Sequence, residues 1–209
     1  MYALVEDSSV NKIITNPKSM IIGDVRYPAK IFQLWSNSEL NAIGIYEVIT
    51  DTTNKKDEQW YINTNETYSF ADDQVTRSWG TATPKAHADS LWTQQDSDDG
   101  DLPSDKAIGD LKDEGLKTVL IKILKNQVAN ELAKTDWYIT RNTEKSTAIP
   151  SSISTHRDAV RTKQAEMETS ITNASDTPAL ETLYTYVNTG TEENPVMERP
   201  LGELPILES

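Results

Sequence analysis

The run LKTVLIKILKNQVANELAKTDWYITR, residues 116–141, decides the fold of the C-terminal half of the chain. Its apolar residues recur at intervals of three and four, at Leu116, Leu120, Ile123, Leu124, Val128 and Leu132. An α-helix has 3.6 residues per turn, so this spacing places those side chains on one face. The pattern therefore predicts a helix that begins at Lys106 or Leu116 and ends at Lys134, next to the TDWYITR stretch.

Two further helices are expected after this one. The second begins after Pro150, because the restricted φ of proline suits the entry to a helix. Its apolar stripe consists of Ile153, Val160, Met167 and Ile171. The third begins at Asp176, a residue type that caps helix N-termini, with Pro178 in the first turn. Short connections between them predict a helical hairpin with a third short helix over residues 106–187.

The N-terminal part of the chain has the shorter period of β-strands. Residues 2–6 and 10–14 are alternating or β-branched runs with turn-forming Asp and Ser between them, which predicts a hairpin. Further β-rich runs cover residues 45–50, 59–63, 67–70 and 75–83. Ser36 followed by Glu39 fits a capping box and predicts one short helix. Residues 1–83 are thus expected to form a mostly-β unit, and the chain as a whole an α+β fold.

Residues 84–105 join these two parts and carry a concentration of acids. They include Asp89, Asp96, Asp98, Asp99, Asp101 and Asp105, with few apolar residues. This composition predicts an acidic linker that is extended by its own charge. A calcium loop is the alternative, because hard cations prefer carboxylate oxygens. The spacing argues against calcium, since a loop begun at Asp96 has Gly100 in its fifth position, whereas an EF-hand loop needs glycine in its sixth.

The net charge and the missing cysteine bound the partners and the chemistry. The 209-residue chain has a formal charge of −13 and no cysteine. An acidic surface disfavours nucleic acid and anionic membranes as partners. Without cysteine there are no disulfides, no thiol catalysis and no thiolate metal sites. The first residues do not fit a signal peptide, and no run approaches about 18 apolar residues, so a soluble chain without an export signal is expected.

No motif in the sequence fixes a chemical activity. His87 and His156 are the only histidines and fall on different predicted segments, so spacing marks neither a metal site nor a nucleophile–base pair. The GxSxG, P-loop and GxGxxG patterns are all missing. We therefore predict no catalytic, cofactor-binding or metal-binding residues, no cofactor, and a protein that is not an enzyme. Trp35, Trp60 and Trp79 are expected in the β core, with a sugar-stacking platform as the alternative.

The TDWYITR stretch is either a binding site or a joint between helices. Asp136 stands at the predicted end of the first helix, and Arg157 and Arg161 lie one turn apart on the second. If the two helices are antiparallel, Asp136 can pair with one of these arginines, whose guanidinium offers a fork of donors. We expect this pair to order the hairpin and Trp137 to pack beneath it.

The last segment, residues 188–209, is predicted to be an extended arm. Pro195, Pro200 and Pro205 recur in it at every fifth residue. Its apolar side chains are expected to lie on a partner surface as an extended peptide does. These candidate partner-binding residues are Val196, Met197, Leu201, Leu204, Ile206 and Leu207.

The run LAKTDWYITRNTEKSTAIPSSISTHRDAVR, residues 132–161, resembles a pattern found in phage tail assembly chaperone-like and tail-fibre-associated proteins. In that pattern a helix ends at a TDW triplet and a second helix carries an R-x-x-x-R sequence. The positions that match are Thr135, Asp136, Trp137, Arg141, Pro150, Arg157 and Arg161. The stretches MYALVEDSSV and YPAKIFQLWSNSELNAIGIYEV are also similar to the front half of proteins encoded near tail genes in tailed phages of marine bacteria.

This resemblance implies a non-enzymatic bacteriophage protein that is made in the host cytoplasm and located in the tail of the virion. It implies a structural subunit of the fibre or baseplate region that binds other tail proteins, with homo-oligomer formation left open. The alternatives are a tail-fibre assembly factor that is absent from the mature virion, and a tail module that binds host glycans. A linker and an arm fit a protein that bridges two partners.

Overall fold

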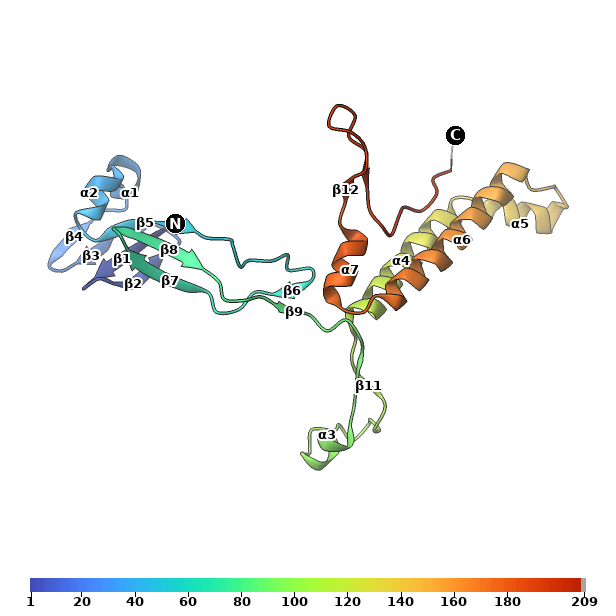
Figure 1. Ribbon diagram of the computed structural model, residues 1–209, viewed down its shortest axis with the longest axis horizontal. Coiled ribbons are helices and arrows are strands. Elements are labelled where there is room, and N and C mark those ends of the chain that lie inside the picture. The colour runs from blue at the N-terminus through green and yellow to red at the C-terminus, as the bar shows by residue number, and fades with distance from the viewer. Residues whose placement is uncertain (208–209) are drawn as a thin grey trace. The chain divides into compact units, whose positions relative to one another are not determined.

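The computed structural model describes residues 1–207 of the 209-residue chain. The fold is mixed α+β, with a strand-rich N-terminal region and a helical C-terminal region (Figure 1). The chain divides into two compact units: unit 1 is Met1–Thr83, and unit 2 begins at Pro84. Each unit has its own set of buried side chains.

Unit 1 is built on a curled five-stranded sheet. Its strands are β1 (Tyr2–Glu6), β2 (Ser9–Ile14), β5 (Ile45–Thr50), β7 (Thr67–Ala71) and β8 (Gln74–Ser78), in the order β2-β1-β5-β8-β7. Neighbouring strands are antiparallel except β5 and β8, which run parallel. Asp7 and Ser8 join β1 to β2 with φ values of 49° and 59°, as in the tight turns that suit β-hairpins. The hairpin predicted from residues 2–6 and 10–14 is therefore present.

Shorter elements complete unit 1. They are the strand pairs β3 (Met20–Ile22) with β4 (Val25–Tyr27) and β6 (Tyr61–Ile62) with β9 (Thr83–Pro84), and the helices α1 (Ile31–Leu34) and α2 (Asn37–Asn41). The predicted capping box is present at α2, where the Ser36 amide donates to the Glu39 carboxylate at 2.8 Å. The sequence predicted one short helix and the structure has two, because α1 is a single turn without a side-chain cap to mark it.

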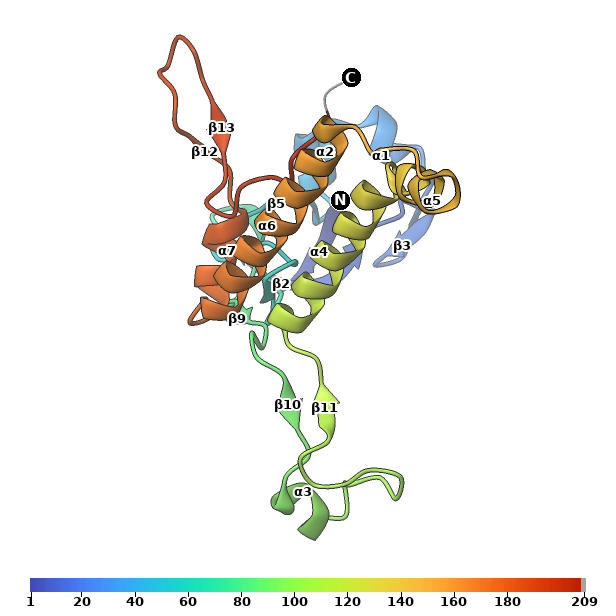
Figure 2. The ribbon, with the colours of Figure 1, turned by 90° about the vertical axis from the view of Figure 1, so that its right-hand side faces the viewer.

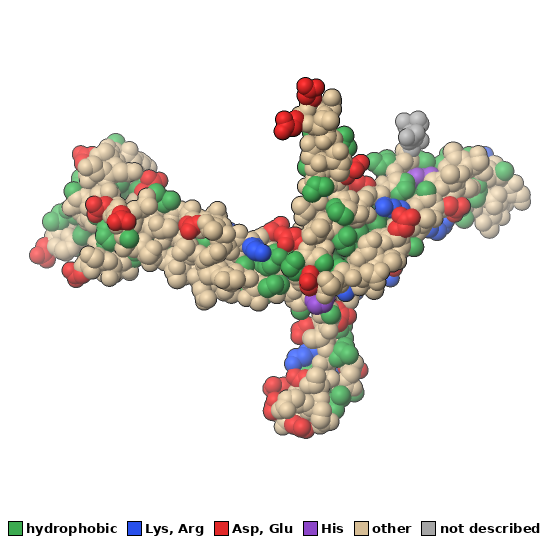
Figure 3. Space-filling model, viewed as in Figure 1, with side chains coloured by type: hydrophobic (Ala, Val, Ile, Leu, Met, Phe, Trp, Pro, Cys, Tyr) green, Lys and Arg blue, Asp and Glu red, His purple; other side chains and the backbone are tan. Residues whose placement is uncertain are grey.

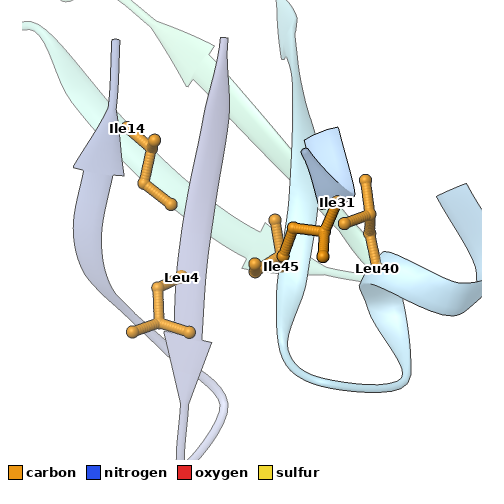
Figure 4. Close-up of a cluster of buried hydrophobic side chains, with 5 residues drawn as sticks. All are labelled: Leu4, Ile14, Ile31, Leu40 and Ile45. Atoms are coloured by element: carbon orange, nitrogen blue, oxygen red, sulfur yellow. The ribbon is translucent and has the colours of Figure 1, made fainter. Parts of the chain in front are cut away.

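The core of unit 1 draws on both the sheet and the short helices. Its buried cluster consists of Leu4, Ile14, Ile31, Leu40 and Ile45, from β1, β2, α1, α2 and β5 (Figure 4). Trp60 and Trp79 are buried as well, and Trp35 packs against the cluster. These tryptophans contribute their area to packing, which weakens the alternative that they form a sugar-stacking platform.

Unit 2 is built on two long helices, α4 (Leu116–Ala133) and α6 (Ser151–Asn173), which lie side by side (Figure 2). Their buried apolar side chains are Leu120, Leu124 and Val128 on α4 and Ile153, Val160, Met167 and Ile171 on α6. The next helix, α7 (Thr177–Tyr184), is capped by Asp176, which accepts a bond from the Ala179 amide at 2.8 Å. The three helices predicted from apolar periodicity are therefore present. Within residues 1–207, no helix combines the length and the hydropathy needed to cross a membrane.

Residues 84–105, predicted as an extended acidic linker, instead form the first part of a hairpin that continues to Asp113, so the first long helix begins at Leu116 and not at Lys106. The elements of this hairpin are β10 (Ser90–Leu91), α3 (Gln94–Asp98) and β11 (Leu111–Asp113), and β10 pairs with β11. Local bonds outweigh the repulsion between the acids, because Thr93 and Asp96 form a capping box and Lys112 pairs with Asp96. The two ends of the segment are tied together by the Gly115 amide, which donates to Asp89 at 2.7 Å. Acidic side chains gather at its tip (red near the bottom of Figure 3).

The predicted C-terminal arm, which belongs to unit 2, is partly folded against α7. Strand β12 (Val187–Asn188) pairs with β13 (Met197–Glu198), so a hairpin replaces the first part of the arm. Leu201 is only 2% exposed, and its amide donates to the Leu183 carbonyl at 3.0 Å. The prediction that Leu201 binds a partner is therefore wrong, because its side chain is already buried. Val196, Met197 and Ile206 are exposed, Leu204 and Leu207 are half-buried, and residues 208–209 lie outside the described part of the chain.

Candidate functional site

The candidate site is the joint where α4 ends and the next helix begins. After Ala133 and a break of two residues, the chain enters α5 (Asp136–Lys145), which the sequence did not predict. Most of TDWYITR therefore lies inside a helix and not in a turn. Thr135 is buried at the break, and its hydroxyl donates to the Leu132 carbonyl at 3.0 Å. This side-chain bond to the backbone competes with helix continuation, which explains why α4 stops here.

Arg157 of α6 holds the break together. Its Nη1 atom donates to the Leu132 carbonyl at 2.8 Å, to Thr135 Oγ1 at 2.7 Å and to Asp136 Oδ1 at 2.8 Å. The Leu132 carbonyl belongs to the last turn of α4 and also accepts from the Thr135 amide at 3.0 Å. Asp136 lies in the first turn of α5, where a negative charge is favoured. The predicted pair between Asp136 and an arginine of the second helix is present, and Arg157 is that arginine.

The bonds of Arg157 differ in strength because their partners differ in exposure. The Arg157 side chain is 10% exposed, whereas that of Asp136 is 60% exposed. A charge pair with one partner in water contributes little, as most surface ion pairs do. The buried bonds to Thr135 and to the Leu132 carbonyl matter more, because without them the largely buried guanidinium loses two of its acceptors.

A second polar pair, which the sequence did not predict, also links α4 to α6. His156 Nε2 lies 3.2 Å from Glu131 Oε1, and both side chains are largely buried. Within residues 1–207, neither of these two atoms has a hydrogen-bond partner. Glu131 also bonds to Lys134, and this bond, together with the nearby His156, lowers the pKa of Glu131 below its usual 4.5. The only sequence signal was that Glu131 precedes Thr135 by one turn and that His156 adjoins Arg157.

The prediction that Trp137 packs beneath the joint is wrong. Its side chain is 50% exposed on α5. The ring stacks on Tyr138, with centroids 3.7 Å apart, and the Arg141 guanidinium lies 5.8 Å from the ring centroid. Consecutive helical residues point about 100° apart, so the turn that directs Asp136 to Arg157 directs Trp137 outward.

The remaining motif residues lie outside the polar joint. Pro150 occupies the N-cap position of α6. Arg161 bonds to Asp158 of its own helix at 3.2 Å, and both side chains are exposed. Thus Thr135, Asp136 and Arg157 meet, and Trp137 and Arg141 lie on the outward face of α5.

The geometry of the joint suits the positioning of helices. Its buried donors and acceptors face one another across α4, α5 and α6, and the part that reaches solvent is the α5 face. In the part of the chain that the structure describes, no three His, Asp or Glu side chains gather as a metal-binding group. Comparison of the chain with protein-family models, curated proteins and solved structures finds no match.

Proposed function

We propose that the chain is a non-enzymatic structural subunit of a bacteriophage tail, in the fibre or baseplate region, and that it binds other tail proteins. The tail assignment rests on the similarity of residues 132–161 to tail-associated proteins. The binding role rests on one structural observation, the outward face of α5 on which Trp137 and Arg141 lie one turn apart.

This α5 face has the composition of a protein-binding hot spot. Trp137 is a large aromatic side chain that is half-exposed to solvent, and Arg141 is exposed beside it, with its guanidinium 5.8 Å from the ring centroid. Trp and Arg are enriched among the side chains that dominate binding energy at interfaces. The Arg157 bonds fix the start of α5, so the face is ordered before a partner arrives, which lowers the entropic cost of binding.

The arm provides a second proposed contact. Val196, Met197 and Ile206 are exposed apolar side chains, and they lie on a hairpin and on the final segment rather than on α5. Once one of two contact surfaces on a chain is bound, the other is held close to its own partner, so the effective concentration for the second binding step is raised. This arrangement supports a subunit that connects two neighbouring tail proteins.

Mass spectrometry of purified virions tests the tail assignment. The protein should be present at a constant ratio to the other tail proteins in intact particles. Detection in infected cells but not in particles would replace the structural role with that of an assembly factor. Absence from both fractions of a phage lysate would remove the tail assignment altogether.

Substitution of Trp137 tests the binding face independently of the phage assignment. Trp137→Ala should weaken capture of the partner proteins by tenfold or more, which corresponds to about 1.4 kcal/mol or more. The matched control is Leu91→Ala, because Leu91 is an apolar residue of the same unit that is 51% exposed. The thermal midpoint of both variants should stay near that of the natural protein. Equal loss of binding in both variants would show that α5 is not the binding face.

A further inference from the structure

Helix α4 carries a second stripe of uncharged residues besides the one it buries against α6. The stripe consists of Leu116, Val119, Ile123, Asn126 and Asn130. Their spacing alternates between three and four residues, which is the a and d spacing of a heptad repeat. In a chain in which 25% of residues are charged, five successive positions of this stripe carry no charge.

Four of the five residues of this second stripe are exposed in the described part of the chain, and Leu116 is half-buried. Val119 is 38% exposed and Ile123 is 48% exposed, and Asn126 and Asn130 are exposed as well. At about 100° per residue, the stripe lies roughly a third of a turn away from the buried residues Leu120, Leu124 and Val128. The contact with α6 therefore covers one side of α4 and leaves an apolar side of the same helix in solvent.

The order of residues along the stripe favours a second copy of this chain in parallel orientation. Its first three positions are apolar and its last two are amides. Parallel pairing in register places apolar residues opposite apolar residues and Asn opposite Asn. An amide both donates and accepts, so two identical amides can satisfy each other, and such pairs fix register in coiled coils. Antiparallel pairing would instead bury Asn126 and Asn130 against Leu116 and Val119, without hydrogen-bond partners.

We propose that the protein self-associates through this stripe, with α4 of one copy lying parallel to α4 of a second copy. Lys122 flanks the stripe, and its positive charge is paired with Glu114 of its own chain. The two copies of Lys122 therefore do not oppose the pairing through unbalanced like charges. The proposal is independent of the tail assignment, since it depends only on the surface of α4.

The mass of the protein in solution provides the first test. Sedimentation equilibrium should give a multiple of 23.4 kDa for the natural chain. Ile123→Asp should raise the dissociation constant by tenfold or more, because it places like charges in the paired stripe. Ala129→Asp is the matched control, since Ala129 is exposed on the same helix but lies off the stripe. A mass of one chain at every concentration, or equal weakening by both variants, would overturn the proposal.

Disulfide trapping provides a second test that does not rely on a disruptive substitution. The chain has no natural cysteine, so Asn130→Cys and Ala129→Cys each introduce a single thiol. In parallel pairing the two copies of residue 130 face each other within disulfide reach, about 5.5 Å between Cα atoms. In an antiparallel pair centred on Ile123 they would lie about 21 Å apart along the helices. Rapid interchain disulfide formation by Asn130→Cys and not by Ala129→Cys is expected. Equal trapping rates would refute parallel pairing through the stripe.

Discussion

Arg157 is the side chain on which the arrangement of α4, α5 and α6 depends most. Its Nη1 atom contacts a carbonyl, a hydroxyl and a carboxylate that belong to two different helices or to the break between them. Because the guanidinium is largely buried, its charge is tolerated only while these acceptors surround it. Trp137 directly follows Asp136 in α5, and its side chain points about 100° away from that of Asp136. Its aromatic ring therefore lies in solvent and not among the buried groups around Arg157.

Replacement of Arg157 should destabilise unit 2. Arg157→Met keeps the apolar stem but removes the donors, and we expect a loss of about 3 kcal/mol in the free energy of unfolding. Urea denaturation followed by far-UV circular dichroism measures the loss. Arg161→Met is the matched control and should change stability by less than about 0.5 kcal/mol, because Arg161 is exposed. Equal stability of the two variants would contradict the structural role of Arg157.

Glu131 should make the stability of unit 2 depend on acidity. The bond from Lys134, with a smaller contribution from His156, lowers the pKa of Glu131 in the folded chain below its usual 4.5. The folded state therefore binds the proton less well than the unfolded state. The stabilisation is fully present above pH 4.5 and is lost as the pH falls through the lowered pKa.

Glu131→Gln should remove this part of the acid dependence. Denaturation midpoints of the natural chain and the variant, measured from neutral pH down through pH 4.5, should converge as the pH falls. A constant difference between the two proteins across this range would show that Glu131 does not titrate differently on folding.

The helices and hairpins show how local signals combine with distant contacts. Capping boxes set the starts of α2 and α3, and Asp176 caps α7, so these helices begin where short-range bonds satisfy the first amides. The break between α4 and α5 needs a distant contact as well as the local bond from Thr135 to the Leu132 carbonyl, because it is held by Arg157, which lies 25 residues from Leu132 and 22 residues from Thr135 in the chain. The acidic hairpin depends on local and distant bonds together. Its local bond is the cap at Thr93, and its distant one joins Asp96 to Lys112, which are 16 residues apart.

The acidic hairpin should loosen when Asp96 is replaced. Bonds from Lys112 and from Thr93 hold the pKa of Asp96 well below its usual 3.8, so this carboxylate is charged in the folded chain. Asp96→Ala removes the carboxylate half of the capping box together with the ion pair, and hydrogen exchange at the Thr93 amide should accelerate. Asp105→Ala is the matched control, because Asp105 lies in the same hairpin outside the capping box. Unchanged exchange rates in Asp96→Ala would show that other bonds hold the hairpin.

As a whole, the chain is two units with different secondary structure and separate cores. Unit 1 has the core cluster of Leu4, Ile14, Ile31, Leu40 and Ile45, and unit 2 has the apolar stripes of α4 and α6. A unit with its own core can fold without its neighbour. The proposed binding face, the arm and the proposed self-association stripe all belong to unit 2.

The two units should unfold in separate transitions. Trp60 and Trp79 are buried in unit 1, so tryptophan fluorescence reports mainly on that unit, whereas helical circular dichroism reports mainly on unit 2. The midpoints of the two signals in urea should differ, and Arg157→Met should lower only the second. Coincident midpoints that shift together in this variant would indicate a single cooperative unit.

The sequence by itself determined three of the helices and the first hairpin. Apolar spacing predicted α4 and α6, a cap followed by proline predicted α7, and β-branched runs around turn residues predicted the first hairpin. These patterns are informative because they record whether each side chain faces solvent or a core, which is a local property. The pairing of Asp136 with an arginine was also within reach, because a carboxylate at a helix junction needs a donor nearby.

Only the tertiary structure decided which arginine binds Asp136, that Trp137 points outward, that residues 84–105 fold back, and that Leu201 is buried. Each of these outcomes depends on bonds between residues far apart in the chain, such as the Leu201 amide with the Leu183 carbonyl or the Gly115 amide with Asp89. Charge density predicted an extended linker because repulsion can be read from composition, whereas the bonds that outweigh it require a particular partner at a particular distance. Local patterns report the preference of a side chain for core or solvent, and the choice of partner follows from the summed free energy of contacts between distant segments.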